Sequence, residues 1–316
     1  MKGPRLLFFE CSLIQTLFLP FAHIFPSHRM ISWGVLWLLL VSVSGCTDNP
    51  YTHRSQFIMV PQSYENQMGE QAYDQLFKNP KVVMSKDPKE IEPVERVAKR
   101  IIEAAKHSKY AERAKQFDWE VTVIKDDKTK NAFALPGGKI AVYTGIFPMA
   151  KNEAGLAAIL GHEVTHALAR HGAERMSQGM VAQFGLTAAS VALQTQGLSP
   201  QMNQLAMQAL GLGTQVGVLL PFSRKHESEA DYVGLLMAAQ AGYDPREAVR
   251  IWQRMMQASK GQPPEFMSTH PAHQTRITDL EKWMPQATAI YNRVPKAPVA
   301  DLPPISSPIS QKASPP

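Results

Sequence analysis

The pattern of apolar and polar positions predicts helices along most of the chain. Residues 63–77 form one candidate helix, and residues 91–117 form an amphipathic one with Val94 and Val97 on the same side. Residues 118–126 alternate between apolar and polar side chains, which predicts a strand. We therefore expect an α+β fold, with a small β-sheet over a mainly helical body.

The stretch NAFALPGGKIAVYTGIF, residues 131–147, predicts a β-hairpin. Pro136, Gly137 and Gly138 supply the turn, and residues 139–145 predict a half-buried strand.

The run ILGHEVTHALARHG, residues 159–172, places two histidines and a glutamate in an otherwise apolar helix. His162 and His166 are four residues apart, so their side chains lie on one face and can point at a common atom. Glu163 stands at the edge of that face, near enough to bond a metal-bound water. Asn152 is a plausible N-cap for this helix. The alternative is a buried helix with two satisfied histidines, but burying all three polar groups is costly unless a metal satisfies them.

A second helix rich in carboxylates is expected over residues 222–245. It matters because two histidines leave a catalytic zinc ion one protein ligand short. Glu227 and Asp231 share a helix face, so Glu227 can ligate while Asp231 accepts a hydrogen bond from a ligand histidine. Glu229 is expected to point elsewhere, as a solvated charge. Taken alone, the segment is typical of an exposed acidic helix start.

These motifs together resemble the gluzincin metallopeptidases of the family that contains the CaaX prenyl endopeptidase, HtpX and the mitochondrial Oma protease, in particular its periplasmic bacterial lipoproteins. The matching stretches are GHEVTHALARHGAERMS, LPFSRKHESEADYVGL and the hairpin above. The resemblance implies a mainly helical zincin-type domain with a small β-sheet at the active-site cleft, and one zinc ion per chain. It assigns zinc ligation to His162, His166 and Glu227, the general base to Glu163 and the supporting carboxylate to Asp231.

The hairpin is also the candidate substrate strand, because an extended peptide can pair with the backbone of a strand beside the cleft. The residues that would offer these backbone groups are Asn131, Ala132, Phe133 and Ala134. An ordinary hairpin strand without this role is the simpler interpretation, and the two are compatible.

The stretch STHPAHQTRITDLEKW, residues 268–283, places His270 and His273 on a loop before a helix that Pro271 starts. The resemblance favours His270. It either takes the fourth zinc position as a latch in a resting state or donates a hydrogen bond to the developing oxyanion. The alternative is a structural loop with solvated imidazoles.

The composition predicts one good-sized core with extensions at both ends. The 316 residues are 44% hydrophobic and carry a net charge of +6. Because the basic residues are scattered without aromatic residues between them, we expect no nucleic-acid binding.

The cysteines, Cys11 and Cys46, lie near the N-terminus, so no disulfide framework is expected. The apolar run ISWGVLWLLLVSVSGC ends in small residues and Cys46, which resembles a bacterial lipobox with a lipidated cysteine after signal cleavage. A plain signal peptide or a short membrane anchor is the alternative. Both Met1 and Met30 are candidate starts.

The expected organisation has four parts, and the third of them contains an unusual segment without charged residues. The parts are a leader over residues 1–46, a polar tether over 47–60, a peptidase domain over 61–290 and a disordered proline-rich tail over 291–316. Residues 176–223 contain no charged side chain, yet glutamines interrupt each apolar run before the ~18 residues that a membrane span needs. We favour a mobile helical hairpin beside the cleft there, as a lid or an oligomer contact.

Together, these observations predict that the protein is a zinc-dependent endopeptidase of the bacterial cell envelope. It would be held by its lipid at the periplasmic face of the outer membrane and cleave misfolded or unassembled envelope proteins, with Glu163 as general base. The alternative is a non-catalytic, metal-binding envelope scaffold on the same fold. Glu163 argues against the scaffold, because zinc binding alone does not need it.

Overall fold

The computed structural model describes residues 46–195, 199–202, 204–205, 207–208, 220–258, 266, 270 and 274–305. Apart from Cys46, the predicted leader lies outside these residues, as do Pro271 and His273.

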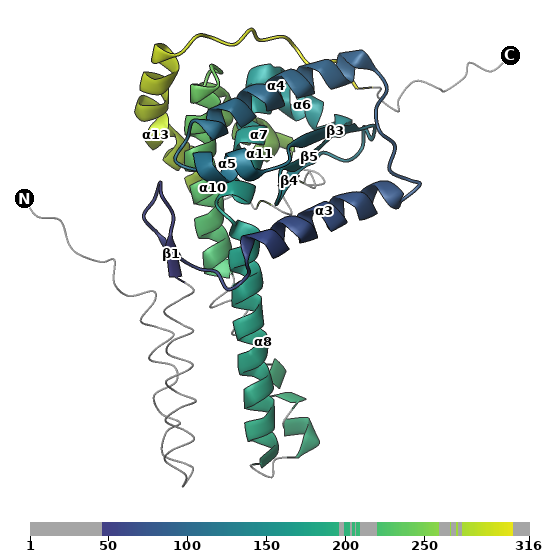
Figure 1. Ribbon diagram of the computed structural model, residues 1–316, viewed down its shortest axis with the longest axis vertical. Helices are drawn as coiled ribbons and strands as arrows, with labels where there is room; N and C mark the ends of the chain where they lie inside the picture. Colours follow the sequence, from purple (N-terminus) through teal and green to yellow (C-terminus); the bar gives the residue numbers. More distant parts are fainter. Residues whose placement is uncertain are drawn as a thin grey trace, which may run out of the picture.

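The described residues form a mainly helical α+β body with two small sheets, which confirms the predicted fold class (Figure 1). The strands are β1 (Cys46–Asp48), β2 (Ser55–Phe57), β3 (Glu120–Ile124), β4 (Ala132–Leu135) and β5 (Lys139–Tyr143). The helices are α3 (Gln62–Lys78), α4 (Pro88–Lys106), α5 (Ala111–Gln116), α6 (Phe147–Ala150), α7 (Glu153–Leu168), α8 (His171–Thr195), α10 (Leu220–Gln240), α11 (Arg246–Ala258) and α13 (Gln274–Arg293), with a 3₁₀ turn at Thr144–Ile146.

Helix α7 forms the centre of the body. It packs against α4, α10, α11 and β4, and every residue except Ala158 and His166 is buried. A helix that is apolar nearly all round is stable only when neighbours cover all its faces. The Asn152 side chain accepts a hydrogen bond from the Gly155 amide at 2.9 Å, which confirms the predicted N-cap. The two predicted metal-binding histidines therefore stand on the most enclosed helix of the fold.

The three-stranded sheet has the order β3-β5-β4, with β5 parallel to β3 and antiparallel to β4. Gly137 and Gly138 both have positive φ, at 86° and 99°, so glycine suits the turn between β4 and β5. The predicted hairpin is confirmed. Within the part of the chain that the structure describes, β4 is an edge strand of this sheet, and one side of it packs on α7.

Two glycines set the close approach of α7 and α10. A Cβ atom on Gly161 would lie 2.7 Å from the Gly234 carbonyl oxygen, and one on Gly234 would lie 2.7 Å from the His162 amide nitrogen. Only glycine fits such a backbone contact without shifting the helices. The crossing brings the segment 227–231 of α10 next to His162.

Helix α8 starts at a sharp break after α7. Arg170 has φ = 59°, the left-handed region that costs a non-glycine residue roughly 1–2 kcal/mol. Its guanidinium group holds this conformation through the Glu65 carboxylate at 2.7 Å and the Val60 carbonyl at 2.5 Å.

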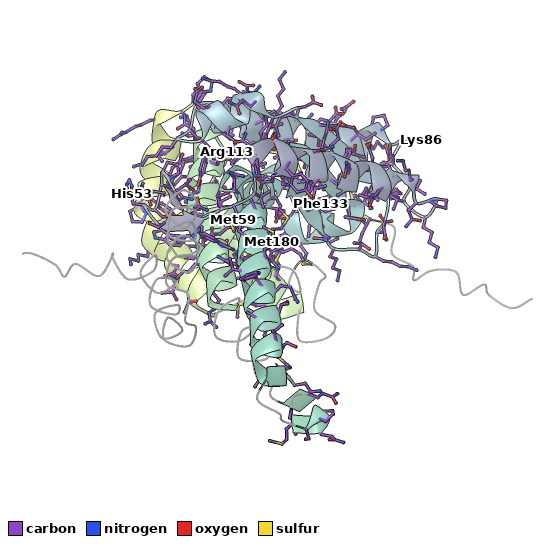
Figure 2. All side chains as sticks on the ribbon, turned by 60° about the horizontal axis from the view of Figure 1, so that its bottom comes forward. His53, Met59, Lys86, Arg113, Phe133 and Met180 are labelled. Carbon is purple, nitrogen blue, oxygen red and sulfur yellow. The ribbon has the colours of Figure 1, made fainter. Side chains whose placement is uncertain are left out.

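Beyond its first turns, α8 projects away from the body (Figure 1) and carries exposed Met180, Phe184 and Val191. Met180 is labelled on this projecting helix in Figure 2. The prediction that this charge-free segment packs beside the cleft is therefore wrong for its first half. Among the described residues, no helix combines the length and the apolar character needed to cross a membrane.

The predicted tether over residues 47–60 is instead an ordered hairpin. Strands β1 and β2 pair antiparallel, and the buried Asn49 side chain accepts from the Tyr51 amide at 2.9 Å and donates to the Tyr110 hydroxyl at 2.7 Å. Gln56 donates to the Ala169 carbonyl at 2.8 Å. Polar side chains here satisfy buried groups of the body, which composition alone does not reveal.

The predicted disordered tail is also wrong for residues 291–305. Helix α13 continues to Arg293, and the following extended chain pairs with the start of α7. The Glu153 amide donates to the Ala300 carbonyl at 3.0 Å, and the Leu302 amide donates to the Lys151 carbonyl at 2.9 Å. A helix N-terminus leaves backbone donors free, and this proline-rich segment satisfies one of them.

Candidate metal centre

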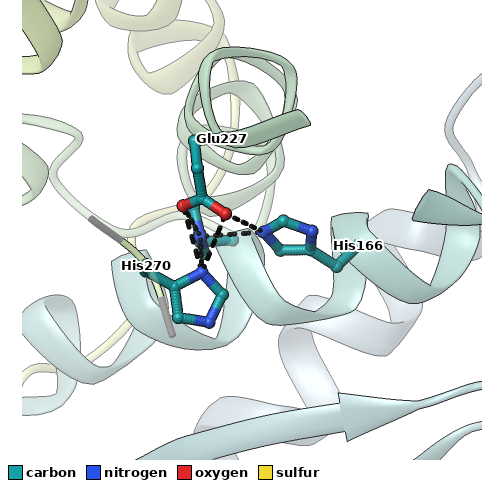
Figure 3. Close-up of side chains that lie close together, drawn as sticks. His166, Glu227 and His270 are labelled. Atoms are coloured by element: carbon teal, nitrogen blue, oxygen red, sulfur yellow. Dashed lines mark hydrogen bonds and ion pairs between the residues drawn. The ribbon is translucent and has the colours of Figure 1, made fainter. Parts of the chain in front are cut away.

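Four side chains from α7, α10 and the residues before α13 point at one small volume. One ligand atom each from His162, His166, Glu227 and His270 all lie within 4.8 Å of one another. The Nε2 atoms of His162 and His166 are 3.0 Å apart, and each is 3.4 Å from a carboxylate oxygen of Glu227. Figure 3 shows Glu227 reaching from α10 toward the rings of His166 and His270. The structure thus brings together the three predicted metal ligands.

His270 lies inside this cluster. Its Nδ1 atom is 3.0 Å from Glu227 Oε2 and 3.2 Å from His162 Nε2. Its ring stacks on Phe266, with ring centroids 4.6 Å apart. The solvated structural loop that stood as its alternative is wrong, because His270 is buried.

Glu163 is buried beside the cluster, and its Oε1 atom has no hydrogen-bond partner among the residues that the structure describes. His270 Nε2 lies 3.4 Å from this oxygen, which is ion-pair distance without hydrogen-bond geometry. Burial raises the pKa of Glu163 above its ordinary value. A buried carboxylate with an unsatisfied oxygen needs a further polar partner, and a water molecule can provide it.

Asp231 supports His162 as predicted, and the structure adds a residue that the motifs did not reveal. Asp231 Oδ1 is 3.0 Å from His162 Nδ1, and Arg276 of α13 bonds both carboxylate oxygens of Asp231 at 2.6 Å. Arg276 also donates to Glu227 Oε2 at 2.9 Å and lies 3.6 Å from the centroid of the Trp252 ring. No residue spacing in the sequence announces this arginine, because it comes from a different helix.

The donor set fits a zinc ion. Two imidazole nitrogens and a carboxylate are a typical catalytic zinc set, and zinc requires them deprotonated. Burial holds the pKa of His166 well below its usual value, so its ring is neutral. Burial would raise the pKa of Glu227, but the neighbouring histidines outweigh it and keep this pKa well below its usual range.

His162 is the exception in the metal-free protein. Burial lowers its pKa, but hydrogen bonds to Asp231 and Glu227 outweigh burial and raise the pKa to about 9. Zinc binding must therefore displace a proton from His162 near neutral pH.

Glu229 is not the solvated charge that the sequence predicted. It is buried, and its Oε2 atom lies 2.9 Å from His171 Nε2 and 2.8 Å from an Arg54 nitrogen. His171 in turn contacts His166, with the two Nδ1 atoms 2.9 Å apart. On an unbroken helix, His171 would point away from His166, because residues five apart do not share a face. The backbone break at Arg170, which the helix pattern does not predict, turns His171 toward His166.

The remaining predicted site residues are not among the four residues of the cluster. Asn131 precedes β4, Ala132 is buried, and Phe133 is partly exposed on this strand, where Figure 2 labels it. Ala134 is partly buried against the hydrophobic core. Cys46 is the first residue of β1, and its backbone is in register with Phe57.

The protein family follows from this geometry and from a direct match. The model of peptidase family M48 matches residues 88–284, which include all four cluster residues. The chain belongs to peptidase family M48. The predicted family, zinc as cofactor and metalloendopeptidase activity are thereby confirmed. The non-catalytic scaffold is wrong.

Two mitochondrial relatives are similar to this chain along most of its length, and a bacterial relative along about half. The mitochondrial metalloendopeptidase OMA1 of Schizosaccharomyces pombe is 38% identical over 242 residues, which are 75% of this chain and 66% of that protein. Its counterpart in Saccharomyces cerevisiae is 31% identical over 275 residues, 81% of this chain and 76% of that protein. The beta-barrel assembly-enhancing protease of Escherichia coli is 30% identical over 152 residues, 47% of this chain and 31% of that protein.

The predicted bacterial envelope location is wrong. The relatives that align over 75% and 81% of this chain are mitochondrial enzymes, whereas the bacterial protease aligns over 47%. The signal peptide and the lipobox at Cys46, from which the periplasmic face of the outer membrane was inferred, are likewise not supported by these mitochondrial relatives.

Proposed function

We propose that this chain is a mitochondrial zinc endopeptidase in which His162, His166 and Glu227 hold the metal and Glu163 is the general base. The observation that carries the proposal is the convergence of two Nε2 atoms and one carboxylate within 4.8 Å. Beside them lies a buried oxygen of Glu163 that has no hydrogen-bond partner among the described residues. The mitochondrial relatives support the location.

The chemistry follows from the residues around the cluster. Zinc, when bound, supplies a Lewis acid that lowers the pKa of water and polarises the scissile carbonyl. Glu163 accepts the proton of the attacking water and passes it to the leaving amine, which requires no covalent intermediate. Burial raises the pKa of Glu163, which makes its carboxylate a stronger base toward the proton of water. Asp231 keeps His162 oriented, and Arg276 keeps Asp231 ionised.

Strand β4 is proposed as the place where substrate binds. Among the described residues it is an edge strand, so the backbone groups of Asn131, Ala132, Phe133 and Ala134 that face away from β5 can pair with an extended peptide. The Ala132 amide donates to the Asn131 side chain at 2.9 Å, and a bound peptide would replace that contact. Backbone pairing gives affinity without strong side-chain preference, which suits unfolded segments of many proteins.

His270 is proposed as a latch. Its Nδ1 atom lies among the ligand atoms of the other three residues, where it takes the place that water needs. The alternative role as an oxyanion donor predicts the opposite result. As a latch, His270→Ala should raise the turnover of an unfolded protein; as an oxyanion donor, the same change should lower it. Metal content should change little in either case, because the other three ligands remain.

Metal removal tests the proposed function directly. Purified protein should contain one zinc ion per chain and cleave an unfolded protein such as casein. A chelator should abolish cleavage, and added zinc should restore it. His162→Ala should lose both metal and cleavage, whereas a metal-free wild-type preparation with full activity would refute the proposal.

The location needs its own experiment. The full chain, expressed in yeast with a C-terminal fluorescent tag, should co-fractionate with mitochondria and resist added protease until the mitochondrial membranes are opened. A tag found in other fractions would overturn the mitochondrial part of the proposal and leave the chemistry intact.

A further inference from the structure

A second cluster of buried charged groups lies next to the metal centre, between α8, α10 and the β1–β2 hairpin. Its centre is Arg54, which bonds Glu174 at 2.6 Å and Glu229 at 2.8 Å. Thr52 of the same hairpin donates to the other oxygen of Glu229. All three charged groups are largely withdrawn from water, and buried charges are kept only when they are paired.

The side chain of His171 connects this cluster to the metal centre. His171 lies between Glu229 and His166, with Nε2 2.9 Å from Glu229 Oε2 and Nδ1 2.9 Å from His166 Nδ1. The His171 ring also stacks on His226, with centroids 4.5 Å apart and planes 17° from parallel. The ring is therefore fixed on its flat face and on both nitrogens.

The protons in this row of groups follow from chemistry. A neutral His166 that offers its Nε2 lone pair to a metal carries its proton on Nδ1. That N–H donates to His171 Nδ1, which must then be an acceptor, so the proton of His171 is on Nε2 and donates to the Glu229 carboxylate. Each of the three groups thus has one compatible protonation state.

We infer that His171 is a positioning residue for the zinc ligand His166, and that Glu229, held by Arg54 and Thr52, fixes the tautomer of both rings. A ligating histidine usually donates its second N–H to a carboxylate or a backbone carbonyl. Here the carboxylate acts through an intervening imidazole. The inference rests on the proposed function, because it takes His166 as a ligand.

The sharpest test compares two replacements of His171. His171→Phe keeps a ring that stacks on His226 but offers no acceptor to His166. His171→Asn loses the ring but keeps a carbonyl oxygen close to the place of Nδ1. Zinc affinity is measured by competition with a chromophoric chelator. It should fall 10–100-fold in His171→Phe and stay within about threefold of the wild-type value in His171→Asn. A purely structural role predicts the reverse order.

A spectroscopic measurement complements the measurement of zinc affinity. In cobalt-substituted protein, the visible absorption bands report the ligand geometry. These bands should shift in His171→Phe and stay near their wild-type positions in His171→Asn. Identical spectra in all three proteins, together with equal zinc affinities, would overturn the inference.

Glu229 has a matched control in Glu174. Both carboxylates are buried and bond Arg54, but only Glu229 contacts His171. Glu229→Gln should lower zinc affinity about tenfold, whereas Glu174→Gln should leave it unchanged. Both should lower the melting temperature of the zinc-free protein, because each leaves Arg54 with one carboxylate fewer. Equal losses of zinc affinity would show that the cluster only stabilises the fold.

Failure of the inference and failure of the proposed function are distinguishable. A wild-type protein that binds no zinc refutes the assignment of His166 and with it the inference. A wild-type protein that binds zinc and retains the same affinity in His171→Phe refutes the inference alone.

Discussion

The two metal-binding histidines of α7, His162 and His166, are supported in different ways. His162 bonds a carboxylate directly, and Asp231 comes from the same face of α10 as Glu227. His166 reaches its carboxylate, Glu229, only through His171. The carboxylate of the first support shares one face of α10 with the ligand Glu227 and is held by Arg276 of α13, whereas the second support needs α8, α10 and the N-terminal hairpin together. When a support is built from several segments far apart in the chain, the sequence shows no regular residue spacing by which to recognise it.

The largest expected difference between the two supports is in stability. Asp231→Ala leaves Arg276 and His162 buried without their carboxylate, which should cost about 3–5 kcal/mol of unfolding free energy. Zinc affinity should fall about 10–100-fold as well. Urea denaturation of the zinc-free protein and chelator competition measure the two effects. Asp231→Asn, which keeps size and one acceptor, should lose less, and equal behaviour of both variants would contradict the account.

The pH response of the zinc-free protein sharpens the comparison. Burial lowers the pKa of His162, but Asp231 and Glu227 outweigh it and raise the pKa to about 9, so its stabilising contribution is present below pH 6.5 and lost toward pH 9. Burial lowers the pKa of His171 to about 4, so the folded state loses stability as the pH falls from 6.5 to 4. Each contribution is of the order of 3 kcal/mol.

Imidazole proton resonances measure these two titrations separately. His162 should remain charged up to about pH 9, and His171 should remain neutral down to about pH 4. Both rings titrating together near pH 6.5 would show that the two supports are equivalent and that neither ring is held as described.

A substitution at the crossing of α7 and α10 should have a smaller effect on stability and should disturb the supports of both histidines. Gly234→Ala places a Cβ atom 2.7 Å from the His162 amide nitrogen, so α7 and α10 must move apart at a cost of about 1–3 kcal/mol. Zinc affinity should fall because Glu227 moves with α10. Gly179→Ala on α8 is the control, since nothing lies within 4 Å of the added atom. Equal stability of the two variants would contradict the proposed crossing.

Much of the metal centre could be predicted because helical spacing is a local property. Residues four apart share a face whatever surrounds the helix, so His162 with His166 and Glu227 with Asp231 were assigned as pairs from sequence alone. The hairpin before the 3₁₀ turn was likewise predicted from its glycines and its alternation.

The parts that could not be predicted depend on contacts between distant segments. Glu229 is two residues from Glu227 and looked solvated, until Arg54 from the N-terminal hairpin is placed beside it. Arg276 is one more basic residue on a helix until it meets Asp231. Residues 294–305 are rich in proline, yet they are ordered because α7 offers free backbone groups at its N-terminus.

In the proposed mechanism, Glu163 performs proton transfer next to a zinc ion that it does not bind. The most direct test is zinc content and turnover of Glu163→Gln, measured on the same preparation with an unfolded protein as substrate. We predict unchanged zinc content and turnover at least ~100-fold below wild type. Turnover at the wild-type rate with zinc bound would contradict the claim.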